Sequence, residues 1–460
     1  MDRTLIIDCK SKIGEDVKIC GWVYTRRDHG KILFLDVTDR SGLMQAVVSQ
    51  NIHLPGDNTN SSSHLEGVAI PGGGELHPQD VVCITGKVNK RPENLINKNI
   101  PTGEIEISAD NIEILSKAAE LPFDMGGKEL DLQLPTLLDF RSLTLRHPKI
   151  KAIFKVQEVV VDAFREGLKN KDFTEFQAPV IIPQTAEGGA DVFEVKYFEH
   201  KAFLAQSPQF YKQILVAVYE RVFAVNKTLR AEPSVTTRHL TEVTTLDAEF
   251  GFIDSWQDVM DMAGYIIKYI LDRVEKECGD ILKMYGASIP KVTDKIPQIK
   301  LREAQEIIYK RTGRDNRKEP DLQPEDEREI CKWSLEEKGS DLIFITHYPV
   351  SKRPFYTFED LDDSGYTLSF DLIGRGTEWM TGGQRIHELE KLVENAKTRG
   401  IDIQKSELYM QAFKYGMPPE GGFSFGSERI VMHILGLGNV REASLFPRDM
   451  ERVDIRLSQK

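Results

Sequence analysis

Residues 17–48 carry a two-residue alternation of apolar and polar side chains, broken at short polar turns. This period is typical of strands that bury one face. The turns Asp28-His29-Gly30-Lys31 and Asp39-Arg40-Ser41-Gly42 separate three such runs, which therefore form an antiparallel meander. Two further runs, at 80–88 and 104–114, bring the total to five short strands, which favours an OB-type β-barrel over residues 1–115.

From residue 147 the pattern becomes a mixture of amphipathic helices and strands. Helical spacing predicts helices at 150–168, 256–279, 386–399 and 427–437, and strands are predicted at 173–182, 221–232, 242–252, 342–346, 367–373, 377–380 and 421–426. Because strands follow strands directly, we expect an α+β domain over 147–460, on a mainly antiparallel sheet flanked by helices. Residues 116–146 are expected to be a linker, and 290–340 a peripheral region without an evident role.

Composition narrows the class of protein. Lys and Arg total 60 and Asp and Glu total 72, a net charge of −12, which excludes a protein that coats nucleic acid by charge alone. There is no signal-peptide pattern and no apolar run of about 18 residues, so we expect a cytoplasmic protein without a membrane span. The five cysteines are scattered and never spaced CxxC, which argues against a disulfide framework or a thiolate zinc site. The polar stretch 51–78 is expected to be a surface loop.

Three polar clusters stand out in the second domain. Period-2 alternation places Arg230 and Glu232 on one strand face, and likewise Thr245, Asp247 and Glu249 on the returning strand. A run from Glu378 to Arg385 surrounds a Gly-Gly turn, and Glu428-Arg429 opens a helix after a glycine-rich strand. Neither a P-loop nor a Rossmann turn occurs. The simpler interpretation of these clusters is that they are solvated ion pairs on the surface. The combination of arginines, carboxylates and glycine-rich backbone instead favours a site that binds a polyphosphate with magnesium.

These clusters resemble motifs of a known family. Leu229-Arg230-Ala231-Glu232, with Arg238-His239-Leu240-Thr241-Glu242, resembles motif 2 of the class II aminoacyl-tRNA synthetases, and Gly426-Ser427-Glu428-Arg429 resembles motif 3. The segment around Pro179 is similar to motif 1, which forms the dimer interface in that family. Gln206–Gln213, Arg353–Thr357 and Leu445–Asp449 resemble the aspartyl-tRNA synthetases. The resemblance covers nearly the whole chain.

The resemblance implies an enzyme that joins L-aspartate to ATP as aspartyl-adenylate and passes the aspartyl group to tRNA. It implies catalytic roles for Arg230, Glu378 and Arg429, and magnesium, the cofactor bound with ATP, on Glu378 and Thr381. The ATP-binding positions are Arg230, Glu232, Arg238, His239, Leu240, Glu378, Gly426, Ser427, Glu428 and Arg429. The aspartate-binding positions are Glu187, Gln209, Lys212, Arg230, Asp247, Thr381 and Arg385. Lys212 and Arg385 are expected to be two cations facing the substrate side chain.

Two positions depart from the family pattern. Val243 stands where many relatives have a phenylalanine that stacks on adenine, and Ser427 stands where the family has an apolar residue.

The first domain is similar to the anticodon-binding barrel of the same family. The resemblance points to Arg27, Phe34, Gln45 and Glu93 as anticodon contacts, with Phe34 offering a stacking face for an unpaired base. A core position is the alternative interpretation of Phe34. The implied partners are tRNA(Asp), with tRNA(Asn) left open, and a second copy of the chain through the motif 1 region.

Three alternatives remain at this point. An asparaginyl-tRNA synthetase shares the architecture, but Lys212 and the Arg375-Gly376-Thr377-Glu378 run speak against it. A paralogue that uses aspartyl-adenylate to make asparagine would need no anticodon module. An inactive tRNA-binding protein would not need the full set of charged motif residues.

Overall fold

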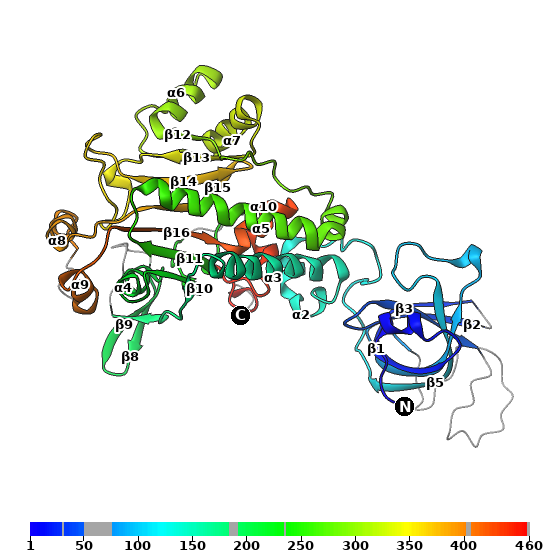
Figure 1. Cartoon of the computed structure of the whole chain (residues 1–460). Helices are drawn as coiled ribbons and strands as arrows, with labels where there is room; N and C mark the ends of the chain where they lie inside the picture. Colours follow the sequence, from blue (N-terminus) through cyan, green and yellow to red (C-terminus); the bar gives the residue numbers. More distant parts are fainter. Residues whose placement is uncertain (30–31, 50–75, 184–191, 234–235, 402–405, 458–460) are drawn as a thin grey trace. The chain divides into compact units, whose positions relative to one another are not determined.

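The computed structural model describes residues 1–29, 32–49, 76–183, 192–233, 236–401 and 406–457. The chain divides into two compact units, Met1–Asp131 and Leu132–Lys460 (Figure 1). Helices α1 (Leu134–Asp139) and α2 (Arg141–Thr144) lie within the segment that the sequence suggested as a linker. Most of the loop expected at 51–78 lies outside the described residues.

The first unit is a closed five-stranded barrel, which confirms the OB-type expectation. Its strands are β1 (Asp16–Asp28), β2 (Ile32–Thr38), β3 (Leu43–Ser49), β4 (Val81–Lys90) and β5 (Ile105–Ser116), in the order β1-β2-β3-β5-β4. Alternate residues of β2, Leu33, Leu35 and Val37, are buried in its core, as the period-2 pattern predicts.

A disulfide joins Cys20 on β1 to Cys83 on β4. The sequence argued against a disulfide framework, and it did not predict this single disulfide. The two residues are 63 positions apart in sequence, but the antiparallel register sets them directly opposite each other, with 4.1 Å between their Cα atoms. Sequence spacing does not reveal such a cross-strand neighbour. The remaining cysteines, Cys9, Cys278 and Cys331, are buried free thiols.

The second unit is built on an eight-stranded sheet in the order β12-β13-β14-β15-β16-β11-β10-β6. These strands are β6 (Thr174–Glu175), β10 (Arg221–Leu229), β11 (Glu242–Gly251), β12 (Gln298–Lys300), β13 (Leu342–Thr346), β14 (Ser369–Gly374), β15 (Thr377–Gln384) and β16 (Glu420–Gly426). Among the described strands of this sheet, the interior pairs are antiparallel, and only the two edge strands, β6 and β12, pair in parallel with their neighbours. The mainly antiparallel α+β sheet is thus confirmed.

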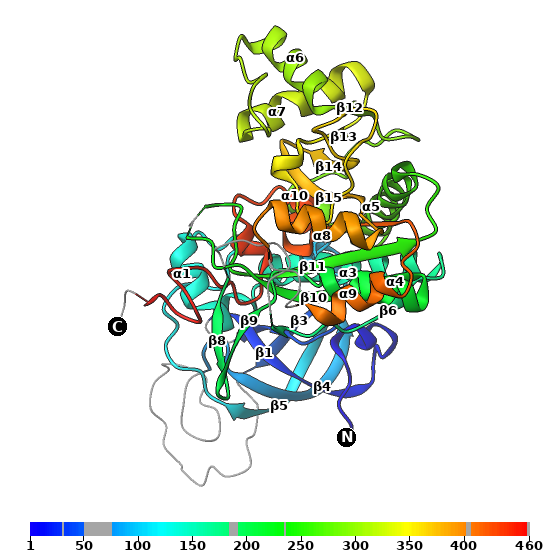
Figure 2. The ribbon, with the colours of Figure 1, turned by 90° about the vertical axis from the view of Figure 1, so that its left-hand side faces the viewer.

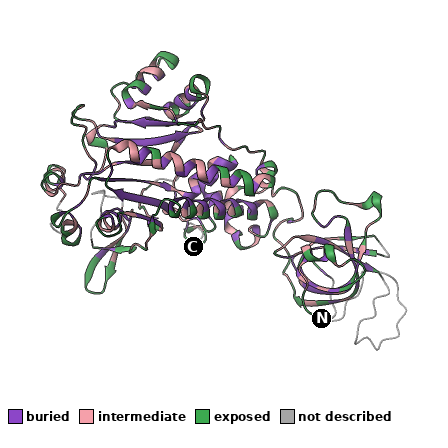
Figure 3. Ribbon diagram, viewed as in Figure 1, coloured by how far each residue is buried: buried purple, intermediate pink, exposed green. Residues whose placement is uncertain are grey.

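Two long helices pack along one face of this sheet (Figure 1). Helix α3 (Pro148–Lys169) places Ile153, Val160 and Phe164 on one side at helical spacing, and α5 (Trp256–Tyr285) begins with a capping box formed by Ser255 and Asp258. Together with α10 (Ser427–Leu435) they bury the alternate strand residues of the sheet, such as Leu246 and Ala248 on β11. Figure 3 shows the central strands as buried. The neighbouring positions Thr245, Asp247 and Glu249 consequently belong to the opposite face.

The strand predicted over 173–182 is wrong as one element. It consists of β6 in the large sheet and β7 (Ile181–Ile182), which pairs with β9 (His200–Leu204) in a small sheet that also holds β8 (Glu194–Tyr197). Pro179 lies between the two pieces, and a proline lacks the N–H that a continuous ladder needs.

The remaining helices lie at the ends of the sheet. They are α4 (Gln209–Tyr219), α6 (Leu301–Thr312), α7 (Pro324–Trp333), α8 (Leu389–Thr398) and α9 (Glu407–Lys414). In the turned view of Figure 2, α6 and α7 lie beside β12 and β13, so region 290–340 forms one end of this unit.

Candidate active site

A row of polar side chains crosses four strands on the sheet face opposite α3 and α5. Asp247 on β11 pairs with Ser424 on β16, Ser424 with Thr381 on β15, and Thr381 with Asp371 on β14. Directly opposed residues of neighbouring strands point to the same side of a sheet. The strand register therefore gathers residues from distant parts of the sequence into one polar surface.

Two cavities lie over this surface and share four lining residues, Arg230, Thr245, Thr381 and Ser424. We call the first the Lys212 cavity; it encloses about 160 Å³ and is also lined by Gln209, Lys212, Asp247, Arg353 and Arg385. The second, the Arg429 cavity, encloses about 260 Å³ and is also lined by Glu232, Arg238, His239, Leu240, Val243, Glu378, Gly426, Glu428 and Arg429. The shared residues make them two halves of one composite site.

The Lys212 cavity contains a buried charge network. Lys212 Nζ lies 3.3 Å from Asp247 Oδ1 and 2.9 Å from Glu249 Oε2, and Arg385 Nε donates to Glu249 Oε1 at 2.7 Å. Burial would raise the pKa of Glu249, but Arg385 and Lys212 hold it below its ordinary value. Both cations thus have carboxylate partners in the protein and also line the cavity.

A second layer lies beneath this network. Gln213 donates to Glu420 at 2.5 Å and accepts from the Tyr409 hydroxyl at 2.9 Å. Burial, followed by the charge of Glu249, raises the pKa of Glu420 well above its ordinary value, which favours the neutral form of this carboxyl. A Cβ at Gly422 would lie 2.0 Å from Glu249 Oε2, so only glycine lets the carboxylate lie against β16.

Arg353 and Asp371 are among the site residues that were absent from the sequence-based candidates. Arg353 donates to Thr381 Oγ1 at 3.1 Å and pairs with Asp371 Oδ2 at 2.8 Å. Arg353 belongs to the Arg353–Thr357 motif, which was a signal that could have found it. Asp371 had no such signal, because only the pairing of β14 with β15 places it beside Thr381.

In the Arg429 cavity, nine of the ten proposed ATP-binding residues line the wall. The exception is Ser427, which is fully buried and accepts a hydrogen bond from Gln157 on α3 at 3.2 Å while donating to Glu428 at 3.1 Å. Its hydroxyl therefore links two buried polar groups, which explains a polar residue where the family pattern is apolar. Glu428 in turn accepts from the Thr244 amide at 3.1 Å and holds α10 against β11.

Charged groups in this cavity are mostly paired. Arg429 Nη1 lies 3.5 Å from Glu378 Oε1, and His239 Nε2 lies 3.8 Å from Glu232 Oε2. Burial lowers the pKa of His239, although Glu232 opposes the shift, and it raises the pKa of Glu378, with Asp371 adding to the effect. Cationic side chains from two motifs therefore converge on one space.

Glu378, Thr381 and Asp371 suit a magnesium ion by the chemistry of their oxygens. Carboxylates and a hydroxyl are the hard ligands that Mg²⁺ prefers. Asp371 Oδ1 is buried without a hydrogen-bond partner in the described part of the chain. A bulge in the pairing of β14 with β15 lets both Glu378 and Thr381 line the cavity although they are three positions apart. Among the described residues, no group of three or more His, Cys, Asp or Glu forms a preset metal cluster.

Three of the four anticodon candidates share one face of the barrel. Arg27 is register-paired with Phe34, and Gln45 with Asp36; Arg27 contacts Asp36 Oδ2 at 2.6 Å and Gln45 Oε1 at 3.2 Å. Phe34 is half-buried between the core residues Leu33 and Leu35, so it is an outer-face position rather than a core one. Glu93 is exposed in the short turn Glu93–Leu95.

Two further points concern the expectations. Glu187, an aspartate-binding candidate, lies outside the described residues. No helix in the described ranges is both long and apolar enough to cross a membrane.

Comparisons with known proteins agree with both units. Residues 133–450 match the family of tRNA synthetases class II (D, K and N), and residues 17–115 match the OB-fold nucleic acid binding domain. An "Aspartate--tRNA(Asp/Asn) ligase" of Aeropyrum pernix is 40% identical, covering 98% of each chain. The protein of the same name from Thermus thermophilus is 39% identical, covering 98% of this chain and 99% of that one.

Among solved structures, asparaginyl-tRNA synthetase from Pyrococcus horikoshii, complexed with asparaginyl-adenylate, superposes with a TM-score of 0.84 at 27% identity, covering 98% of this chain and 99% of that chain. The family match spans well over half of the sequence and contains both cavities. The chain therefore belongs to the class II tRNA synthetases of the D, K and N group.

Proposed function

We propose that the chain is an aspartate–tRNA ligase that activates L-aspartate with ATP and transfers the aspartyl group to tRNA. The observation that carries this proposal is the pair of joined cavities, one with two buried cations and the other lined by arginines. An amino acid in the first and ATP in the second would meet at Arg230, Thr381 and Ser424, which both cavities share.

The donors left in the Lys212 cavity favour a carboxylate side chain. Lys212 uses two contacts on Asp247 and Glu249, and Arg385 uses Nε on Glu249 and Nη2 on the Gly422 carbonyl. Among the described residues, one ammonium N–H of Lys212 and the Nη1 group and second Nη2 N–H of Arg385 therefore remain for a ligand. The side-chain carboxylate of aspartate would accept from both side chains, whereas the NH₂ of asparagine would oppose donors with donors. Asp247 and Gln209 would hold the substrate ammonium group.

Activation needs positioning and charge neutralisation rather than a protein nucleophile. The α-carboxylate oxygen of aspartate attacks the α-phosphorus, the bond to the bridging oxygen breaks, and pyrophosphate leaves with that electron pair. Arg230 would contact the α-phosphate and the attacking carboxylate, Arg238 and His239 the outer phosphates, and Arg429 the adenine. Magnesium held by Glu378 and Thr381, with Asp371 alongside, would supply neutralisation of phosphate charge.

The barrel is proposed to bind the anticodon through Arg27, Phe34, Gln45 and Glu93. The names of the two relatives at 40% and 39% identity favour both tRNA(Asp) and tRNA(Asn) as acceptors. A homodimer through the segment around Pro179 is also proposed, since Val180 and Ile181 there are exposed apolar residues.

Amino-acid-dependent exchange of pyrophosphate into ATP tests the function. We expect exchange with aspartate and almost none with asparagine, which would separate this activity from asparagine activation. Aminoacylation of purified tRNA(Asp) and tRNA(Asn) then tests the second step. Exchange that depends on asparagine and not on aspartate would refute the proposal.

A further inference from the structure

Region 290–340 reaches the Arg429 cavity through Glu327 on α7, which pairs with Arg238 and also accepts a hydrogen bond from the Glu378 backbone. Arg238 Nη1 lies 2.9 Å from Glu327 Oε2 on α7, and Arg238 Nη2 donates to the Gly376 carbonyl at 3.4 Å. Arg238 lines the cavity, whereas Glu327 is not among the described residues that do. Glu327 thus contacts the guanidinium without itself lining the cavity.

This pair is more enclosed than an ordinary surface ion pair. The Arg238 side chain is 29% exposed and that of Glu327 13% exposed. The same burial raises the pKa of Glu327 to about 7, although Arg238 opposes the shift, so the pair is charge-assisted when this carboxyl is ionised, above about pH 7. A guanidinium held by two acceptors has little freedom to rotate away from the cavity.

The Gly376 carbonyl is itself tightly placed. Gly376 has a positive φ of 82°, and a Cβ there would lie 2.7 Å from Arg328 Cγ on α7. Its amide donates to the buried Cys331 Sγ at 3.2 Å, also on α7. The turn between β14 and β15 is therefore packed directly against α7, so both acceptors of Arg238 belong to one rigid assembly.

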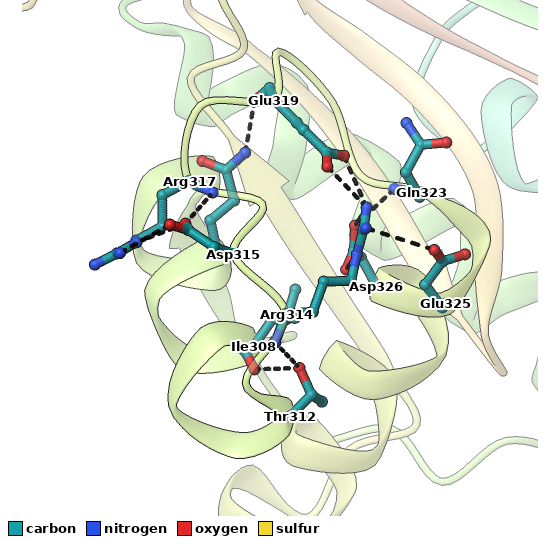
Figure 4. Close-up of polar contacts among 10 residues, drawn as sticks. Ile308, Thr312, Arg314, Asp315, Arg317, Glu319, Gln323, Glu325 and Asp326 are labelled. Carbon is teal, nitrogen blue, oxygen red and sulfur yellow. Dashed lines mark hydrogen bonds and ion pairs between the residues drawn. The ribbon is translucent and has the colours of Figure 1, made fainter.

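The start of α7 is anchored by a second cluster (Figure 4). Arg314 Nε donates to the buried Asp326 at 3.0 Å, and its Nη2 lies 2.8 Å from Glu319. Asp326 also accepts from the Gln323 amide at 3.0 Å, which caps the helix. Asp326 directly precedes Glu327 in the sequence, so this cluster fixes the helical turn that presents Glu327.

We infer that Glu327 is a positioning residue for the outer phosphates of ATP and acts through Arg238. This inference rests on the proposed function, in which Arg238 contacts those phosphates. It gives region 290–340 a role: the region carries the carboxylate that holds a phosphate-binding arginine at the cavity wall. Glu327 itself does not touch the nucleotide.

The test is equilibrium binding of ATP and of AMP to the full chain at about pH 8.5, where Glu327 is ionised, with magnesium and without amino acid or tRNA. Glu327→Gln should raise the Kd for ATP about tenfold, the value of one charge-assisted hydrogen bond, and leave the Kd for AMP nearly unchanged. Glu329→Gln is the matched control, because Glu329 lies on the same helix and pairs with Arg311 instead. The Kd values of the Glu329→Gln variant for ATP and for AMP should equal those of the unaltered protein.

A double-variant cycle separates positioning from a general loss of structure. If Glu327 acts through Arg238, adding Glu327→Gln to Arg238→Met should weaken ATP binding no further. Glu327→Asp, which keeps the charge on a shorter side chain, should bind ATP better than Glu327→Gln.

Unchanged ATP binding in Glu327→Gln, equal losses for ATP and AMP, or a full additional loss in the Arg238→Met background would each overturn the inference. Because no amino acid is present, these results do not depend on whether aspartate is the substrate. Failure of aspartate-dependent exchange in the unaltered protein would instead count against the proposed function.

Discussion

Replacing Lys212 by methionine removes the ammonium group while keeping a similar volume. Lys212 and its partners Asp247 and Glu249 have side chains that are 1%, 1% and 0% exposed, so the loss is not compensated by water. Removing one partner of a buried ion pair costs about 3–5 kcal/mol. Glu249 keeps its ion pair with Arg385 at 2.7 Å, so Asp247 is the carboxylate that mainly loses its partner. We therefore expect the free energy of unfolding to fall by about 3 kcal/mol, the lower end of this range.

The same substitution removes one of two cations proposed to receive the substrate carboxylate. Aspartate-dependent pyrophosphate exchange should therefore fall by roughly a hundredfold in kcat/KM, while the Kd for ATP stays within about twofold. Lys227→Met is the matched control, since Lys227 is 51% exposed on β10 and pairs with Glu242 at 3.5 Å. Circular dichroism would establish that both variants are folded. Near-normal exchange in a folded Lys212→Met protein would refute this account of the cavity.

Three further predictions concern other parts of the chain. Phe34→Ala should weaken tRNA charging by about 1–3 kcal/mol in kcat/KM and leave pyrophosphate exchange intact, and a parallel loss of both would make Phe34 a structural residue. Val243→Phe should add stacking of about 0.5–1.5 kcal/mol and lower the KM for ATP, because Val243 lines the Arg429 cavity; a raised KM would show that the ring collides. Burial raises the pKa of Glu420 well above its ordinary value of 4.5, so the stability of its neutral form is complete below about pH 4.5 and is lost as the pH rises toward the raised pKa. Glu420→Gln should therefore gain thermal stability relative to the unaltered protein as the pH rises above about 4.5, and a difference independent of pH would contradict the assignment.

The helices and strands could be predicted from the sequence because each one shows its periodicity within its own segment. Leu33, Leu35 and Val37 alternate with polar neighbours, and this alone identifies a strand with one buried face. The same holds for α3, where Ile153, Val160 and Phe164 recur on one side. Because each sheet and helix must bury its apolar face against another element, few folds are then possible for the chain.

Several features that sequence patterns missed depend on strand register. Asp371 joins the site only because β14 pairs with β15 at Thr381, and Cys20 meets Cys83 only because β1 pairs with β4 in one alignment. Glu378 and Thr381 should lie on opposite faces by strict alternation, and a bulge brings both to the cavity. Pairing between distant segments is not encoded in either segment alone.

The polar row across β11, β16, β15 and β14 also restricts which mutations this chain can tolerate during evolution. Ser424 lies between Phe423 and Phe425, which are both buried in the core against α3 and α5. Inserting or deleting one residue in β16 would turn a phenylalanine into the cavity and a polar group into the core, and would do so along the whole strand at once. Substrate preference in this scaffold can therefore drift by substitution within the strands, while changes in length are confined to the loops that connect them.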